Sequence, residues 1–176
     1  MKTANKKLFT RNALTSDAEE IAALSSRVYR KEPYTAPEIR GQINNFPEGV
    51  FVAIYEDKIV GYCATLRTTE RAAFKKHTWK QITGGGYGTT HDPKAPWLYG
   101  YEVFVDPSYR RLRIGDRLYR ERRNLCQHYR LKGIIIVGRL PHLSKRLKRV
   151  GTPEEYVRLA QAKKIKDPTF NFQARQ

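Results

Sequence analysis

The sequence predicts an α/β (α+β) fold in which a mixed central sheet is flanked by helices. Segments rich in β-branched and aromatic residues alternate with segments whose apolar residues repeat at helical spacing. Residues 99–138 have the pattern strand, helix, strand, in which the two strands are expected to run parallel. Residues 50–66 have the pattern of two strands joined by a tight turn, which is typical of an antiparallel hairpin.

The N-terminal third is expected to contain one strand and two helices. The strand falls within residues 6–14. The first helix is predicted to start at Ser16, with Glu19 as its capping-box partner, and to end at Pro33. The second is predicted to open at Thr35-Ala36-Pro37 and to close at Pro47-Glu48-Gly49.

Two strands and a long loop are expected next. The strands at 50–55 and 58–66 are joined by Glu56-Asp57, and Gly61 indicates a bulge or a close backbone approach. Residues 69–97 look irregular and contain the glycine-rich run 84–88. A flexible crossover is the favoured interpretation of this segment, and a substrate-facing lid is the alternative. The glycine run is not a Walker loop, because no Lys-Ser/Thr follows it.

The segment that organises the prediction lies between residues 99 and 118. Residues 99–105 are predicted to form a strand, which Asp106-Pro107 stops. A helix begins near Gly115, with Ile114, Leu118, Leu125 and Tyr129 on one face. The basic loop 110–115 therefore opens into a helix N-terminus, whose unpaired N–H groups favour a phosphate or pyrophosphate.

The C-terminal part is expected to add two strands and one helix. Residues 133–138 are a short apolar run, typical of a strand buried on both faces. Residues 139–149 are interpreted as a basic connector. A helix opens at Thr152-Pro153 and ends at Asp167-Pro168, and residues 169–173 alternate as a sixth strand would.

Composition sets limits on the class of protein. The 176 residues suggest one domain, 1–176, and a hydrophobic content of 40% suits a globular fold. No run of 18 apolar residues and no secretory signal is found, so we expect a cytoplasmic protein without a membrane segment. Cys63 and Cys126 are expected as buried small hydrophobic residues. The four histidines lack metal-ligand spacing, so no metal is predicted.

The formal net charge of +17 invites an anionic partner. A cofactor with several phosphates can use only part of this charge. An acidic partner or acidic further domain is the favoured use of the rest. A nucleic-acid surface is possible but not favoured, and a basic surface without a partner stays open as well.

Residues 105–118 resemble the acetyl-CoA motif of the GNAT N-acetyltransferases. That family's signature, Gln/Arg-x-x-Gly-x-Gly/Ala after the fourth strand, falls here on Arg110, Arg113 and Gly115. The departure is Arg113, which stands where the pattern has its first glycine. Arginine offers a phosphate donor, but it adopts a positive φ only at a cost.

The resemblance implies acetyl-CoA as co-substrate and a set of contacts for it. Pantetheine would pair with strand-four backbone beside a bulge, and one amide there would donate to the thioester oxygen. The pyrophosphate would meet the loop and the first helical turn. The cofactor-binding residues implied are Val103, Phe104, Val105, Arg110, Arg111, Leu112, Arg113, Ile114, Gly115 and Asp116.

The resemblance also suggests how protons would move. Glu102 is the candidate general base, because the family often places a glutamate on this strand; the alternative is a strand residue that forms a salt bridge with the basic helix. Many relatives protonate the leaving thiolate with a tyrosine that follows strand five. Residues 139–143 contain no tyrosine, and His142 is the weaker substitute.

A wider resemblance covers most of the chain from Phe46 to Gln173. It is to the N-terminal part of bifunctional proteins that join a GNAT domain to a carbon–nitrogen hydrolase (nitrilase-like) domain. It implies that the GNAT domain here is incomplete, without its seventh strand, and that the hydrolase machinery lies beyond the chain. The segments that carry it are 46–49, 77–86, 97–100, 118–123, 138–141 and 152–157.

Three functional hypotheses follow. The main one is transfer of an acetyl group from acetyl-CoA to an amine acceptor of unknown identity. The second is a non-catalytic GNAT-like domain that regulates or docks onto a hydrolase. The third is a basic RNA-binding module.

Overall fold

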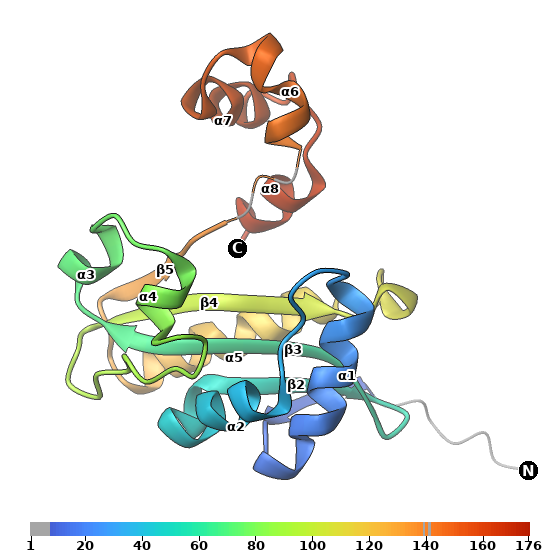
Figure 1. Cartoon of the computed structure of the whole chain (residues 1–176), viewed down its shortest axis with the longest axis vertical. Helices are drawn as coiled ribbons and strands as arrows, with labels where there is room; N and C mark the ends of the chain where they lie inside the picture. The colour runs from blue at the N-terminus through green and yellow to red at the C-terminus, as the bar shows by residue number, and fades with distance from the viewer. Residues whose placement is uncertain (1–7, 139, 141) are drawn as a thin grey trace, which may run out of the picture. The chain divides into compact units, whose positions relative to one another are not determined.

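The computed structural model describes residues 8–138, 140 and 142–176. Its internal contacts divide it into two compact units, one that ends at Ile136 and one from Val137 to Gln176. The larger unit is built on a sheet and the smaller one is helical (Figure 1). A compact unit need not fold alone, so the expectation of one domain stays a prediction.

In the larger unit, residues 8–136 form one mixed sheet of five strands in the order β1-β2-β3-β4-β5. The first four strands pair antiparallel, and β4 pairs with β5 in parallel. The predicted mixed α/β fold is therefore confirmed. The strands are β1 Leu8–Asn12, β2 Val50–Tyr55, β3 Lys58–Thr68, β4 Trp97–Val105 and β5 Gly133–Ile136.

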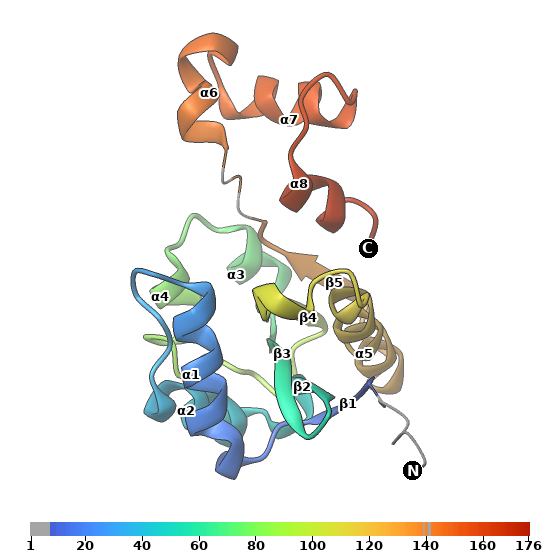
Figure 2. The ribbon, with the colours of Figure 1, turned by 90° about the vertical axis from the view of Figure 1, so that its right-hand side faces the viewer.

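Helices cover both faces of this sheet (Figure 2). The helices α1 Ala18–Val28 and α2 Ala36–Asn45 contribute to a core on one face, where Ile21, Leu24 and Ile39 are fully buried. Helix α5, Ile114–His128, packs on the other face through Ile114 and Leu118. The two cores hold β4 between them, so its side chains are fixed from both sides.

Side-chain caps explain why some helix starts were predictable. Thr35 caps α2 and forms a capping box with Glu38, as expected. The predicted Ser16–Glu19 cap is wrong. Thr15–Asp17 form a 3-10 turn (η1), Asp17 becomes the N-cap of α1, and its carboxylate lies 2.6 Å from Arg11. The same carboxylate accepts from the Leu14 N–H at 2.8 Å, and α1 ends at Val28, before Pro33.

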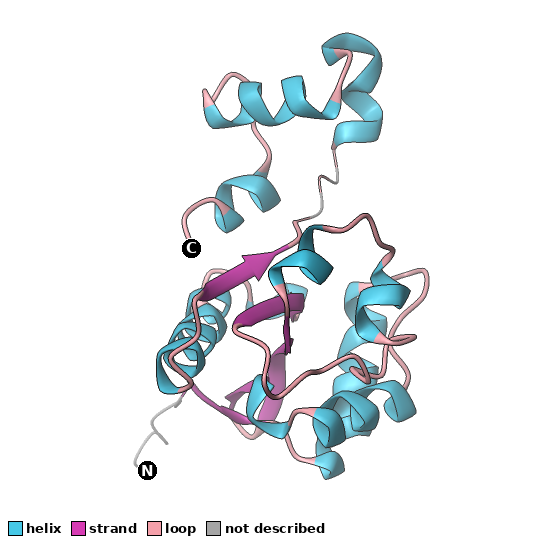
Figure 3. Cartoon of the chain, turned by 90° about the vertical axis from the view of Figure 1, so that its left-hand side faces the viewer, coloured by secondary structure: helices cyan, strands magenta, loops and turns pink. Residues whose placement is uncertain are grey.

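The segment 69–97 is more regular than expected (Figure 3). It contains the short helices α3 Glu70–Phe74 and α4 Trp79–Thr83, and the loop prediction is wrong for them. Thr69 and Thr78 cap the two helices through their hydroxyl groups. The glycine run is tied to α2, because the Gln42 side-chain amide donates to the Gly86 carbonyl at 2.7 Å.

The last strand of the sheet is less buried than predicted. All four residues of β5 are partly exposed. Among the described residues, β5 pairs only with β4 and is an edge strand, so it cannot be covered as a central strand is. A sixth strand is not formed by residues 169–173, which are helical.

The described residues of the smaller unit form three helices, α6 Leu143–Val150, α7 Pro153–Gln161 and α8 Pro168–Gln173. The predicted Thr152 cap of α7 is confirmed. The interpretation of residues 139–149 as a basic connector is wrong, because most of these residues form α6. The sixth strand is wrong because Asp167 starts a helix: its buried carboxylate accepts from the N–H groups of Thr169 and Phe170 and from the Tyr156 hydroxyl.

Candidate functional site

A β-bulge in β4 decides which way the candidate base points. Ala64 pairs with Glu102 and Thr65 pairs with Gly100, so Tyr101 has no partner on β3. The extra residue breaks the alternation of the strand. Tyr101 therefore faces the α1–α2 core, and so does Phe104 three residues later. Glu102 faces that side too, where it meets Tyr29 and Tyr34.

The same bulge coincides with the point where β4 and β5 separate. Their pairing ends at Gly100 and Ile136. The N–H of Asp106 donates to Val60 on β3 at 2.9 Å, and strand groups alternate every second residue. The N–H and C=O groups of Val103 and Val105 therefore point away from β3. Within the larger unit as described, no strand pairs with this edge of β4 beyond Gly100.

The Glu102 carboxylate is held by two tyrosines. Tyr29, just after α1, donates its hydroxyl to Oε1 at 2.8 Å, and Tyr34 donates to Oε2 at 2.5 Å. The Val103 N–H also donates to Oε1, at 2.9 Å. Burial, together with the Glu102 charge, raises the pKa of Tyr34, so this phenol stays protonated as a donor. The expected alternative, a salt bridge to the basic helix, is not the arrangement here, because the carboxylate faces α1.

The basic loop follows the open edge of β4 directly. A 3-10 turn, η3 Pro107–Tyr109, leads into it, and Asp106 caps this turn while it pairs with Arg27 of α1 at 3.0 Å. Arg111 and Arg113 both have a positive φ, 79° and 56°. Arg113 is the N-cap of α5, so the unpaired N–H groups at the start of the helix directly follow a loop that contains three arginines. These arginines are Arg110, Arg111 and Arg113.

The loop carries one feature that opposes an anion. Asp116 lies in the first turn of α5, and its carboxylate accepts from Arg113 Nε at 3.0 Å. The pair is exposed on the arginine side, with 83% of the Arg113 side chain accessible. An entering phosphate can therefore displace this weak contact and take over the arginine.

A family comparison decides what this arrangement belongs to. The model of the Acetyltransferase (GNAT) family matches residues 16–143, which is most of the chain. The chain belongs to this family. The match includes the bulged strand, the basic loop and the whole of α5, so the motif that resembled the GNAT signature lies within it.

Two curated relatives extend the comparison. "Probable hydrolase YhcX" of Bacillus subtilis (strain 168) is 38% identical over 169 residues, and the match covers 96% of this chain. The chain spans only 33% of the length of that relative. "Uncharacterized N-acetyltransferase YkwB" of the same organism is 27% identical, with 94% of this chain and 75% of the relative covered.

Solved structures share the fold at low identity. A GNAT-like decarboxylase, GphF, in complex with isobutyryl-CoA, aligns with a TM-score of 0.75 at 22% identity over 93% of this chain and 82% of its own. Diaminobutyrate acetyltransferase EctA from Paenibacillus lautus, in complex with L-2,4-diaminobutyric acid and coenzyme A, aligns with a TM-score of 0.56 at 18% identity, over 82% and 74% of the two chains.

The structure thus brings the predicted GNAT site residues together in three groups. Val103 and Val105 share the open edge, Glu102 and Phe104 share the α1 face, and residues 110–116 form the loop and first helical turn. His142, the substitute acid, is exposed next to α6 in the smaller unit.

Sequence reasoning missed three residues at this site. Tyr29 and Tyr34 carry no sequence signal, because only the fold brings them to Glu102. Arg122 does carry one. It falls on the apolar stripe of α5, four residues after Leu118 and three before Leu125, where a charged side chain is unexpected.

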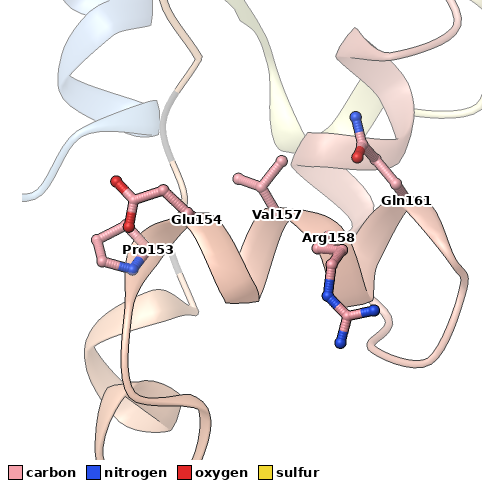
Figure 4. A pocket seen from close by; sticks show the side chains of 5 residues that line it. All are labelled: Pro153, Glu154, Val157, Arg158 and Gln161. Atoms are coloured by element: carbon pink, nitrogen blue, oxygen red, sulfur yellow. The ribbon is translucent and has the colours of Figure 1, made fainter.

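The remaining features suggest no second site of the same quality. A shallow hollow of about 320 Å³ lies along one helix, α7, between Pro153 and Gln161 (Figure 4). Its lining comes entirely from the smaller unit. Among the described residues, no cluster of three His, Cys, Asp or Glu could hold a metal, and no helix has the length and apolar content to cross a bilayer.

Proposed function

We propose that this chain binds a CoA thioester along the open edge of β4 and transfers its acyl group, acetyl in the simplest case, to an amine. Membership of the GNAT family supports acyl transfer from CoA in general. The observation that carries the proposal is the bulge at Tyr101, beyond which no described strand pairs with the edge that carries the backbone groups of Val103 and Val105. The amide-rich pantetheine can pair with such an edge as an added strand would.

The phosphates of CoA would occupy the loop that follows. Arg110, Arg111 and Arg113 belong to the loop that connects β4 to the N-terminus of α5, so their charges and the first N–H groups of the helix are available to the same anion. A helix N-terminus and adjacent guanidinium groups both favour an anion. The spacing of the motif therefore fits a thioester at β4 and a pyrophosphate at the loop.

Glu102 would accept the proton of the acceptor amine. An alkylammonium with a pKa of about 10.4 is only about 0.1% neutral near pH 7.4, which corresponds to roughly 4 kcal/mol. After deprotonation the nitrogen attacks the thioester carbonyl, the C–S bond breaks, and the CoA thiolate leaves. That thiolate has a pKa of about 8.5, so its protonation is only mildly demanding. The Val103 N–H, which donates to Glu102 Oε1 in this structure, would turn to the oxyanion between the two steps and stabilise it.

A second candidate function is a docking or regulatory domain of a longer hydrolase. It is favoured by one observation, that the chain matches 33% of a relative named as a probable hydrolase. This function needs no CoA, so one binding experiment separates the two candidates. In either case the two free cysteines are compatible with the cytoplasm, where we place the protein.

Calorimetric titration with acetyl-CoA at about 50 mM and about 200 mM salt tests the proposal. We expect micromolar binding that weakens modestly with salt, because only a few phosphates are contacted. The variant Arg111→Glu/Arg113→Glu should lose this binding of acetyl-CoA. The matched control, Lys75→Glu/Lys76→Glu, makes the same charge change at exposed positions near α3, at the opposite end of β4. Absence of heat from the folded wild-type chain would favour docking.

A further inference from the structure

Arg122 is a fully buried arginine that lies behind the bulge of β4. Its side chain is 1% exposed. Nη2 donates to the Ala64 carbonyl at 3.1 Å and also to the Glu102 carbonyl. The guanidinium lies over the Tyr119 ring, with Cζ 4.9 Å from the ring centroid. A Cβ on Gly100 would come within 3.0 Å of the same Cζ, so the glycine leaves room for the guanidinium.

The charge of Arg122 is placed against carbonyls rather than against a carboxylate. No ion pair between described residues includes it. Burial of an arginine without a carboxylate is costly. Two neutral side-chain donors could satisfy two carbonyls at lower cost, so hydrogen bonding alone does not explain a charge at this position.

The Glu102 carbonyl connects this charge to the open edge. It belongs to the same peptide unit as the Val103 N–H, and in a trans peptide the C=O and N–H point in opposite directions. The guanidinium bonds the carbonyl from one side, and the N–H donates to an anionic oxygen, Glu102 Oε1, on the other. A cation at the carbonyl polarises the peptide and makes its N–H a stronger donor.

We infer that Arg122 is a positioning residue that polarises the Glu102–Val103 peptide. When the Val103 N–H exchanges its present acceptor, Glu102 Oε1, for the acyl carbonyl oxygen, the polarised N–H binds that oxygen more strongly as negative charge develops there. This inference rests on the proposed function. The competing explanation is that Arg122 only satisfies the carbonyls that the bulge leaves without ladder partners. The two explanations differ in one respect. Polarisation of the peptide requires the positive charge of Arg122, whereas hydrogen bonding to the carbonyls requires only an N–H donor.

The stretching frequency of the bound thioester carbonyl measures the polarisation directly. Acetyl-CoA labelled with ¹³C at the carbonyl would be bound to the whole chain and observed by difference infrared spectroscopy, without any acceptor amine. In the wild type we expect a downshift relative to free acetyl-CoA. Arg122→Gln keeps an N–H donor but removes the charge, and should lose more than half of this downshift while its affinity stays within about threefold. Arg122→Lys keeps the charge and should restore most of it.

Two further variants complete the test. Arg120→Gln removes a charge from an exposed position of the same helix and should leave the band unchanged. If Arg122→Gln does not fold, Gly100→Ala displaces the guanidinium without removing it and should lose part of the downshift. The inference would be overturned if acetyl-CoA bound to Arg122→Gln, or to Gly100→Ala in its place, showed the same carbonyl stretching band as in the wild type. That result would leave the proposed function standing. A wild-type chain that does not bind acetyl-CoA would overturn both.

Discussion

Arg113 adopts a backbone conformation that glycine would adopt without strain. Its φ of 56° and ψ of 31° place it in the left-handed region, which costs a non-glycine residue roughly 1 kcal/mol. The position corresponds to the first glycine of the GNAT signature. This chain therefore has a conformation here that glycine would adopt easily, together with a side chain that adds positive charge.

Replacement of Arg113 by glycine should increase the free energy of unfolding by about 0.5–1 kcal/mol, because the strain is relieved and the exposed contact with Asp116 contributes little. Urea denaturation measures this. Arg110→Gly is the matched control, since Arg110 has a φ of −60° and gains nothing from glycine. A destabilised Arg113→Gly would show that the Arg113 side chain matters more to the loop than its backbone strain.

Glu102 allows a prediction that includes a pH dependence. Without the carboxylate, transfer depends on the small fraction of amine that is already neutral. Glu102→Gln should therefore reduce the acyl-transfer rate by about a hundredfold near pH 7, and the deficit should shrink as pH rises toward the amine pKa. Release of the CoA thiol with a panel of amines measures the rate. Glu70→Gln, at an exposed position of α3, should leave it unchanged, and an equal rate in Glu102→Gln would exclude Glu102 as the base.

Helix α5 is held close to the sheet by the absence of a side chain at Gly61. A Cβ there would lie 2.7 Å from Ile114 Cγ2, in the first turn of the helix. Since the loop arginines precede this turn, the contact limits how near the helix N-terminus lies to the sheet at β3. The close approach that Gly61 indicated in the sequence is thus observed, and a register shift between β2 and β3 falls beside it.

Gly61→Ala should lower the free energy of unfolding by roughly 1–3 kcal/mol through overpacking. It should also weaken acetyl-CoA binding, because the start of α5 is pushed away from the sheet. A double-mutant cycle with Ile114→Ala provides the control: the combined variant should lose less stability than the sum of the two single changes. Strict additivity, measured by urea denaturation, would contradict this close contact.

Local signals predicted the elements whose ends are fixed by neighbouring residues. The hairpin turn at Glu56-Asp57 and the caps at Thr35 and Thr152 are of this kind. Asp167-Pro168 was predicted only to end a helix, but this pair also starts the next one, where the Asp167 carboxylate is held by the distant Tyr156 hydroxyl as well as by the local N–H groups. The burial of β5 could not be predicted from its own residues, because it depends on whether strands from other parts of the chain lie beside it.

Some features of the candidate site were likewise predictable from the local sequence, and others were not. The loop 110–116 and the position of Glu102 on its strand were readable from the motif. The resemblance implied a bulge in this strand but not its place at Tyr101, because which residue bulges depends on how β3, β4 and the buried Arg122 pack together. The tyrosine partners of Glu102 come from a segment about 70 residues earlier, and no periodicity links such distant positions.

The whole chain carries twice as many basic as acidic residues, 34 Lys and Arg against 17 Asp and Glu. One CoA molecule can neutralise only a small part of that excess. The smaller unit contributes four basic side chains on α6 alone, from Lys145 to Arg149, and no residue of α6 is buried. The salt dependence of CoA binding should therefore be shallow even though the protein is strongly basic.

The central claim is that the open edge of β4 binds the thioester arm of CoA. Amide hydrogen exchange of the whole chain, followed by NMR with and without acetyl-CoA, tests it most directly. The Val105 N–H points to the open edge and should exchange markedly more slowly when acetyl-CoA is bound, whereas the Phe104 N–H, which points to β3, should change little. Unchanged exchange at Val105 in a chain saturated with acetyl-CoA would contradict the claim.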